Sequence, residues 1–236
     1  MSPPQAPPPW KAAVERLGAD CPWHWRDLVH LLLLLALAQL LRTRLPANIA
    51  WDVLAFQGAA IVGFLWLARN KPHPFGTPVP LRTIAGQAFL RWLAILPILW
   101  AAALAWNILL TFAGHAPRFQ ESIGLFLAND GILPRIAFVL FAVVLAPLAE
   151  EGLFRGILQP LLIRRAGATT GMALTALGFA ALHGDLGTFV PLAIFSVALS
   201  LAYARTGTLW VSIGMHALFN ATNLALLLLL DRLGVV

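Results

Sequence analysis

Seven apolar stretches alternate with short polar segments along the chain and give the first indication of its fold. They run over residues 28–41, 49–68, 89–113, 136–149, 168–182, 189–204 and 209–230. The apolar residues are continuous and do not alternate with a period of two, which indicates membrane helices and not the strands of a β-barrel. At about 20 residues per span, we predict an all-α fold, a polytopic transmembrane helix bundle of seven or eight spans.

The segments that flank these stretches set the predicted domain boundaries. Residues 1–26 begin with a proline-rich run, so we expect a disordered, partly polyproline tail there. Residues 27–236 then form a single transmembrane helical domain, because no internal repeat or soluble second domain is visible. The fourth stretch continues into the helix-compatible residues 150–165, which leaves two alternatives open. It forms one long helix kinked at Pro147, or a span followed by a surface helix.

Composition and charge favour a membrane protein and argue against a nucleic-acid partner. Of the 236 residues, 60% are hydrophobic and only 11% are charged, whereas a soluble domain carries about 25% charged residues. The basic residues behind the net charge of +6 lie in short loops, which fits the positive-inside rule and attraction to anionic lipid. We therefore predict a cytoplasmic N-terminus. The arginine- and proline-rich, lysine-poor composition indicates a bacterial inner membrane.

Three polar motifs lie inside or beside the apolar stretches of the last third of the chain. They are Glu150-Glu151-x-x-x-Arg155, Phe179-x-x-x-His183 and His216-x-x-x-Asn220. A charge at the centre of a bilayer costs about 2.5–3.5 kcal/mol on insertion scales, so such groups indicate function. His183 lies 33 residues after Glu150 (183 − 150), and His216 lies 33 residues after His183 (216 − 183). Each interval is one span plus a turn, so we expect the motifs to converge at a similar depth.

The two adjacent carboxylates are predicted to have different roles. Glu151 precedes Arg155 by four residues, the orientation that favours an ion pair on a helix. Glu150 points about 100° away from Glu151 and has no partner in its own helix. We therefore interpret Glu151 and Arg155 as a structural ion pair and Glu150 as the reactive carboxylate. The alternative is that all three residues mark a helix end in water.

The candidate catalytic residues are Glu150, Glu151, His183, His216 and Asn220. A buried carboxylate beside an imidazole can activate water near neutral pH, and a second imidazole with an amide can stabilise an oxyanion. The same carboxylate and imidazoles, Glu150, His183 and His216, also match the ligands of a hydrolytic zinc ion. Both alternatives are hydrolysis. The competing class is a non-enzymatic transporter or immunity protein that uses these groups as a proton or ion path.

With their flanks, these motifs resemble those of the CPBP family, the CAAX-prenyl-protease and bacteriocin-processing membrane endopeptidases also called Abi. The flanks are Ala146-Pro-Leu-Ala, Arg155-Gly156 and Arg205-Thr-Gly-Thr-Leu-Trp210, and the similarity covers about residues 133–223. The resemblance implies an α-helical intramembrane protease that cleaves a membrane-anchored peptide or protein with water. It implies that Glu150 and His183 activate that water, while His216 and Asn220 hold the oxyanion.

The resemblance leaves the cofactor and the substrate open. The family has been described both as a metalloprotease family and as glutamate-dependent without a metal, so the cofactor is zinc or none. Prenylated substrates are not implied, because similar proteins also act in bacteriocin maturation, self-immunity and regulation.

Overall fold

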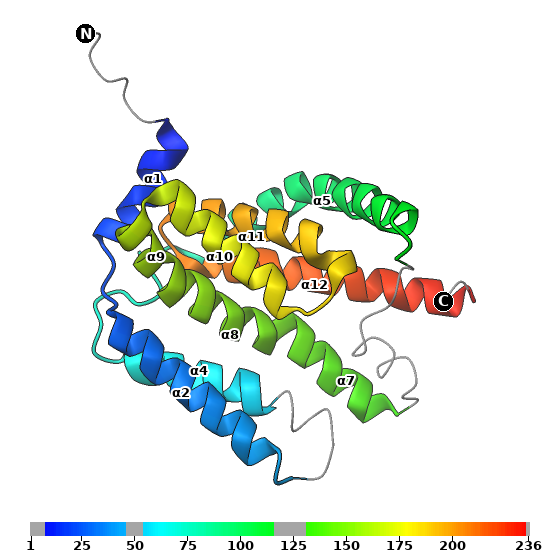
Figure 1. The fold of residues 1–236 in the computed structure, drawn as a ribbon, viewed down its shortest axis with the longest axis horizontal. Coiled ribbons are helices and arrows are strands. Elements are labelled where there is room, and N and C mark those ends of the chain that lie inside the picture. The colour runs from blue at the N-terminus through cyan, green and yellow to red at the C-terminus, as the bar shows by residue number, and fades with distance from the viewer. Residues whose placement is uncertain (1–7, 46–53, 116–130, 235–236) are drawn as a thin grey trace.

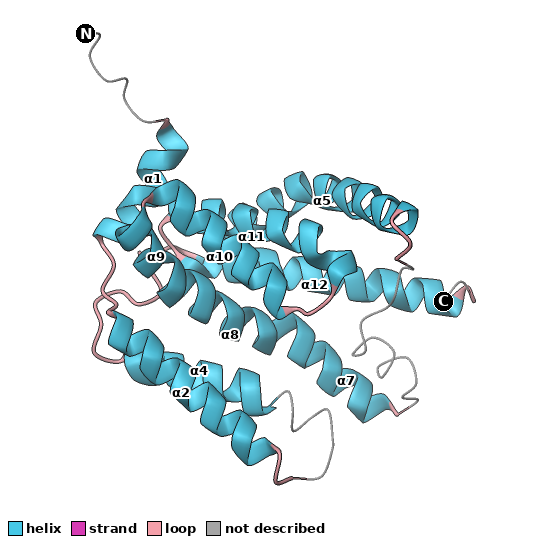
Figure 2. Ribbon diagram, in the orientation of Figure 1, coloured by secondary structure: helices cyan, strands magenta, loops and turns pink. Residues whose placement is uncertain are grey.

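Helices account for most of the residues that the computed structural model describes, which are 8–45, 54–115 and 131–234. In chain order they are α1 (Pro9–Ala19), α2 (Trp25–Arg42), the π-helical turn η1 (Leu54–Gly58), α4 (Ala59–Ala68), α5 (Leu81–Phe112), α7 (Ile132–Leu140), the π-helical turn η2 (Phe141–Leu145), α8 (Ala146–Glu151), the π-helical turn η3 (Gly152–Leu158), α9 (Gln159–Ala166), α10 (Ala168–Leu182), α11 (Leu186–Thr206) and α12 (Leu209–Arg232). Among these residues, β-pairing is limited to an isolated bridge between Gly76 and Thr208, and no strand is drawn in Figure 2. The predicted all-α class is confirmed.

Four helical segments are long and apolar enough to cross a membrane: Leu81–Phe112, Arg135–Ala166, Leu186–Thr206 and Leu209–Arg232. Two shorter apolar helices cover Ala55–Ala68 and Ala168–Leu182. The described part of every predicted apolar stretch is mainly helical, and residues 49–53 of the second stretch lie outside the described residues. The predicted count of seven or eight spans is not confirmed, because α4 and α10 are shorter than the 18–20 residues that a bilayer requires.

Residues 132–166 form one continuous helical run, in which both π-helical turns are explained by a following proline. Pro147 and Pro160 lack the backbone N–H that an α-helix needs at every position. In both places the helix widens just before the proline, so that Ala146 N–H bonds to Phe141 O and Gln159 N–H bonds to Phe154 O, five residues earlier. Of the two alternatives left open by the sequence, the long helix is the one observed.

This continuous helical run of residues 132–166, called the long helix below, passes through the middle of the bundle (Figure 1). Helix α4 packs on α8 and η3 from one side, while α10 packs on α9 and α12 packs on η2 and α8 from the other. Buried aromatic side chains, including Phe154, Phe179 and Phe195, fill the centre. Large apolar side chains such as Leu33 and Leu104 remain exposed on the outer faces of α2 and α5, as expected where a helix faces lipid.

The N-terminal region differs from the predicted disordered tail. Residues Pro9–Ala19 form α1, and Val14 is fully buried in a cluster with Ile163 of α9 and Ala168 of α10. Proline is compatible with the first turn of a helix, since its missing N–H has no partner there in any case. Apolar residues at helical spacing after Pro9 then supply a packing face, which the proline-rich start obscured. Residues 1–7 lie outside the described part of the chain.

Candidate active site

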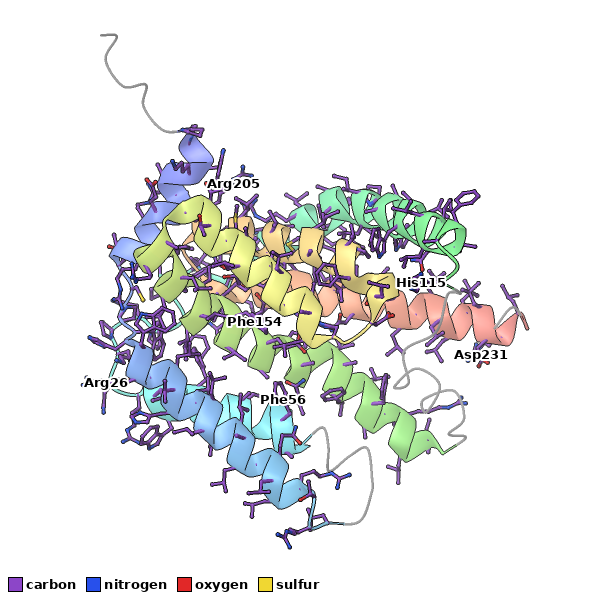
Figure 3. All side chains as sticks on the ribbon, viewed as in Figure 1. Arg26, Phe56, His115, Phe154, Arg205 and Asp231 are labelled. Carbon is purple, nitrogen blue, oxygen red and sulfur yellow. The ribbon has the colours of Figure 1, made fainter. Side chains whose placement is uncertain are left out.

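Four of the five candidate catalytic residues line one cavity of about 460 Å³. Glu150 comes from the end of α8, His183 directly follows α10, and His216 lies on α12. Asn220, one turn after His216, also lines the cavity, but Glu151 does not. In Figure 3, Phe154, one turn after Glu150, lies within the bundle, between Arg26 toward one end and Asp231 toward the other. The motifs therefore converge within the bundle.

Glu151 and Arg155 are fully buried and paired. Arg155 Nη1 donates to Glu151 Oε1 over 2.9 Å, and neither side chain is exposed. Arg155 Nη2 donates to Ser196 of α11, over 2.6 Å to its Oγ and 3.2 Å to its carbonyl oxygen. The guanidinium carbon also lies 4.5 Å from the ring centre of Phe179. Neither residue of this pair is at a helix end in water, and Arg155 ties the long helix to α11.

His216 lies between the two adjacent carboxylates. Its Nδ1 is 3.0 Å from Glu151 Oε1, and its Nε2 is 3.9 Å from Glu150 Oε2. Since a carboxylate only accepts hydrogen bonds, we assign the proton of this contact to Nδ1. The rings of Phe195 and Phe179 pack edge-on against the imidazole, with centroids 5.5 and 5.9 Å away. One oxygen of Glu151 thus holds both Arg155 and His216, which directs Nε2 toward Glu150.

His183 is fixed by its own helix and by the turn that follows. Its Nδ1 lies 2.8 Å from the carbonyl oxygen of Phe179, so Nδ1 carries the proton and Nε2 is free to accept one. Gly184 then adopts a positive φ of 65°, which residues with a side chain disfavour. Asp185 accepts a hydrogen bond from Gly187 N over 3.0 Å and caps α11.

Asn220 makes one hydrogen bond to the backbone of the long helix. Its Nδ2 donates to Ala142 O over 2.8 Å. Ala142 lies in η2, where Ala146 N–H has shifted to Phe141 O and the next residue, Pro147, has no N–H to give. The carbonyl of Ala142 therefore lacks a donor in its own helix, and Asn220 supplies one. An amide nitrogen carries two protons, so one N–H of Asn220 remains.

Several residues at the site were missed by the reasoning from sequence. Asp185, Thr188 and Asn223 also line the cavity, and Ser196 contacts Arg155 from outside it. Asn223 has a readable signal, since it lies seven residues after His216 on the same face of α12. Ser196 is a polar residue within the apolar stretch 189–204, but its partner could not be read from spacing. Much of the remaining wall is apolar and is formed by Leu99, Trp100, Phe138, Phe141, Leu224 and Leu227.

The predicted zinc ligands do not form a metal-binding group. Of the residues described, no three His, Cys, Asp or Glu side chains are grouped so that they could hold a metal ion. The mechanism proposed below therefore uses the side chains and water alone.

Comparison with known proteins identifies the segment that carries all three motifs. Residues 132–222 match the family model described as type II CAAX prenyl endopeptidase Rce1-like. These bounds agree with the predicted 133–223, and the suspected resemblance to the CPBP family is confirmed. No curated protein and no solved structure matches the chain significantly. The family implies a protease with a peptide or protein substrate, and the apolar helices indicate an integral membrane protein.

Proposed function

We propose that this protein is an intramembrane endopeptidase that hydrolyses peptide bonds of membrane-associated substrates. The observation that carries the proposal is the single cavity lined by Glu150, His183, His216 and Asn220, all within the segment that matches the protease family. A carboxylate, two imidazoles and an amide in one partly apolar cavity provide a base, an acid and oxyanion donors.

Glu150 is the general base in this mechanism. Its side chain is 16% exposed, and its buried Oε2 has no hydrogen-bond partner among the described residues. Glu150 takes a proton from water as the water oxygen attacks the scissile carbonyl carbon. His183 Nε2 accepts a hydrogen bond from the same water and orients it. The carboxylic acid then returns the proton to the amine nitrogen as the C–N bond breaks.

His216 and Asn220 stabilise the oxyanion. Glu150, Glu151 and Arg155 together carry one net negative charge, which an imidazolium at His216 balances. Balanced charges among these four side chains matter because an isolated charge in a poorly solvated interior is costly. The imidazolium donates Nδ1–H to Glu151, which leaves Nε2–H for the oxyanion, and the remaining N–H of Asn220 is the second donor.

The apolar wall suits a substrate residue with an apolar side chain beside the scissile bond. Trp100, Phe141 and Leu224 contribute to this wall from α5, the long helix and α12. A membrane-anchored peptide would reach such a cavity with the chain around its cleavage site extended.

The proposal is tested by reconstituting the purified protein in liposomes with a membrane-anchored peptide library and identifying products by mass spectrometry. We expect internal peptide-bond cleavage by the wild type and none by Glu150→Gln. Ion or proton flux through both proteins, without cleavage by either, would favour the transporter class instead.

The cofactor is tested on the same protein after exhaustive chelation, with its metal content measured. We expect cleavage to continue in metal-free enzyme. Activity that disappears with the metal and returns with stoichiometric zinc would overturn the metal-free mechanism and leave the protease assignment intact.

A further inference from the structure

A second cavity, of about 560 Å³, lies at the opposite end of α11 from the candidate active site. The active-site cavity touches α11 as far as Leu192, whereas this cavity begins at Tyr203. Eleven residues separate the two positions (203 − 192), or about 16 Å of helix. Its other walls come from α1, from residues 72–78 and from Gly156 and Pro160 of the long helix. It is therefore a separate site.

The walls of this cavity are held in place by backbone contacts. Thr77 N–H donates to Gly207 O over 2.7 Å, and Leu209 N–H donates to Phe75 O over 2.9 Å. Phe75 also stacks on Trp210, with ring centroids 4.9 Å apart. The loop of residues 72–78 is thus fixed to the start of α12. The volume of the cavity falls in the range of about 300–1,000 Å³ that is typical of small-ligand sites.

Unpaired donors face this cavity. Tyr203 lines the cavity and is only 8% exposed, and its hydroxyl makes no hydrogen bond with the described residues. Arg16 and Arg205 also line the cavity, and neither forms an ion pair with a carboxylate in the described residues. Asp20 is the acidic residue of the lining and His73 its imidazole. With His73 neutral, the side chains carry one net positive charge.

The surrounding end of the bundle is basic. Arg26 and Arg205 lie toward the end of the bundle opposite His115 and Asp231 (Figure 3). Further basic side chains lie within or beside α1, α4, α5 and α9, and of these Lys71 pairs with Asp27 and Arg164 donates to Trp23 O: Lys11, Arg69, Lys71, Arg82, Arg164 and Arg165. Trp210, which is 40% exposed and stacks on Phe75, is an aromatic residue of the kind enriched at the membrane–water interface. At that depth the abundant anions are lipid phosphates.

We propose that this basic pocket, formed by Arg16, Asp20, His73, Tyr203 and Arg205, binds a phosphate group at the membrane surface. Guanidinium groups match phosphate oxygens with paired N–H donors, and the Tyr203 hydroxyl gives a further donor from the floor. The net positive charge of the lining suits the headgroup of an anionic phospholipid. This inference does not depend on proteolysis.

The source of the phosphate is tested by calorimetric titration of the full-length protein in neutral detergent. The probes are short-chain phosphatidic acid, short-chain phosphatidylcholine and inorganic phosphate. We expect phosphatidic acid to bind at least about tenfold more tightly than phosphatidylcholine, since two guanidiniums favour the more anionic headgroup. Competition by millimolar inorganic phosphate would assign the source to free phosphate as well. Equal affinity for the two lipids, with no phosphate binding, would overturn the proposal.

Variants distinguish binding in this pocket from attraction of the lipid by surface charge in general. Arg16→Gln and Arg205→Gln should each weaken phosphatidic acid binding by about fivefold, and Tyr203→Phe by about tenfold, because it removes one hydrogen bond to a charged group. The matched control is Arg232→Gln, which removes the same charge from an exposed site at the far end of α12 and should change nothing. An equal loss in Arg232→Gln, or full binding by Tyr203→Phe, would contradict a built pocket. Unfolding temperatures exclude misfolded variants.

Discussion

Glu150 and Glu151 are chemically identical neighbours in two different environments. Glu150 faces the cavity, partly exposed, with its Oε2 unbonded among the described residues. Glu151 is fully buried, and one of its oxygens accepts from both Arg155 and His216. Successive residues on a helix differ by about 100° in direction, and that rotation separates a carboxylate available to water from one bonded to Arg155 and His216.

The buried carboxylate of Glu151 orients His216, which lines the cavity. Ser196 holds Arg155, Arg155 holds Glu151, and Glu151 fixes Nδ1 of His216. Only Nε2 of His216 is left to act near Glu150. Positioning groups behind a reacting group commonly set its tautomer and direction, so the two carboxylates should fail in different ways when changed.

The largest expected effect is on catalysis by Glu150→Gln. The substitution keeps the side-chain shape but removes the base, so cleavage should fall by about 10²–10⁴-fold, the range for general acid–base groups. The unfolding temperature should stay at the wild-type value. Rates on a membrane-anchored peptide and thermal unfolding in the same detergent check both statements.

A matched control for this comparison is Glu15→Gln, which changes an exposed carboxylate on α1 and should leave cleavage unaltered. Wild-type rates in Glu150→Gln would remove Glu150 from the mechanism.

The next largest effect is on stability by Glu151→Gln. The change leaves Arg155 without its buried partner, which costs about 3–5 kcal/mol when one member of a buried pair is removed. Abundance and resistance to denaturant should fall, together with activity. The double variant Glu151→Gln/Arg155→Met removes both charges and should recover much of the stability but not the cleavage rate, because His216 has lost its anchor.

Two results would change this interpretation. Equal loss of abundance in Glu150→Gln and Glu151→Gln would end the division between a reactive and a structural carboxylate. Normal abundance with equal loss of activity would make Glu151 a second catalytic acid.

A smaller effect is expected from Ser196→Ala. A hydrogen bond to a charged group contributes about 1.5–3 kcal/mol, so unfolding should shift by that amount. The pH profile of cleavage should also change, because Arg155 and Glu151 would hold His216 less firmly. The matched control is Ser200→Ala, a buried serine one turn along α11 whose hydroxyl donates to the neutral carbonyl of Ser196 over 2.8 Å. A pH profile equal to that of Ser200→Ala would make Ser196 merely a packing residue.

Particular residues show how far the sequence could predict this structure. The motif spacing predicted that Glu150, His183 and His216 converge at a similar depth, because each interval matches a span and a turn, and the structure puts all three on one cavity. The contact between Asn220 and Ala142 was not predictable, since it depends on a carbonyl that a π-helical turn before Pro147 leaves without a donor. That is a property of backbone register and not of residue pattern.

Helix length and the N-terminus show a second limit of prediction from the sequence. Apolar stretches located the helices, but a stretch such as 168–182 does not reveal whether its helix crosses the membrane or ends within the bundle. The proline-rich start suggested disorder, although Val14 packs against α9. Burial by a distant helix is a tertiary effect that local composition does not contain.

The smallest expected effect is on stability by Asp27→Asn, and it compares the fully buried Glu151 with a carboxylate nearer the surface. Asp27, before the apolar stretch of α2, pairs with Lys71 over 2.8 Å, with side chains 10% and 17% exposed. Burial acts to raise the pKa of Asp27, but the hydrogen bonds from Lys71 Nζ and His24 N and the charge of Lys71 outweigh it, and the net pKa lies below the usual value. The ionised form is therefore favoured by folding.

Because the folded pKa is lowered, the stabilisation by Asp27 is fully present above the unfolded pKa of about 3.9 and is lost as the pH falls through the folded value. We expect Asp27→Asn to lower stability at pH 7 by about 1 kcal/mol or less, as for other partly exposed pairs. The deficit should shrink in unfolding measurements as the pH falls below about 4. A deficit that stayed constant with pH would mean that Asp27 acts through shape, as a cap of α2, and not through its charge.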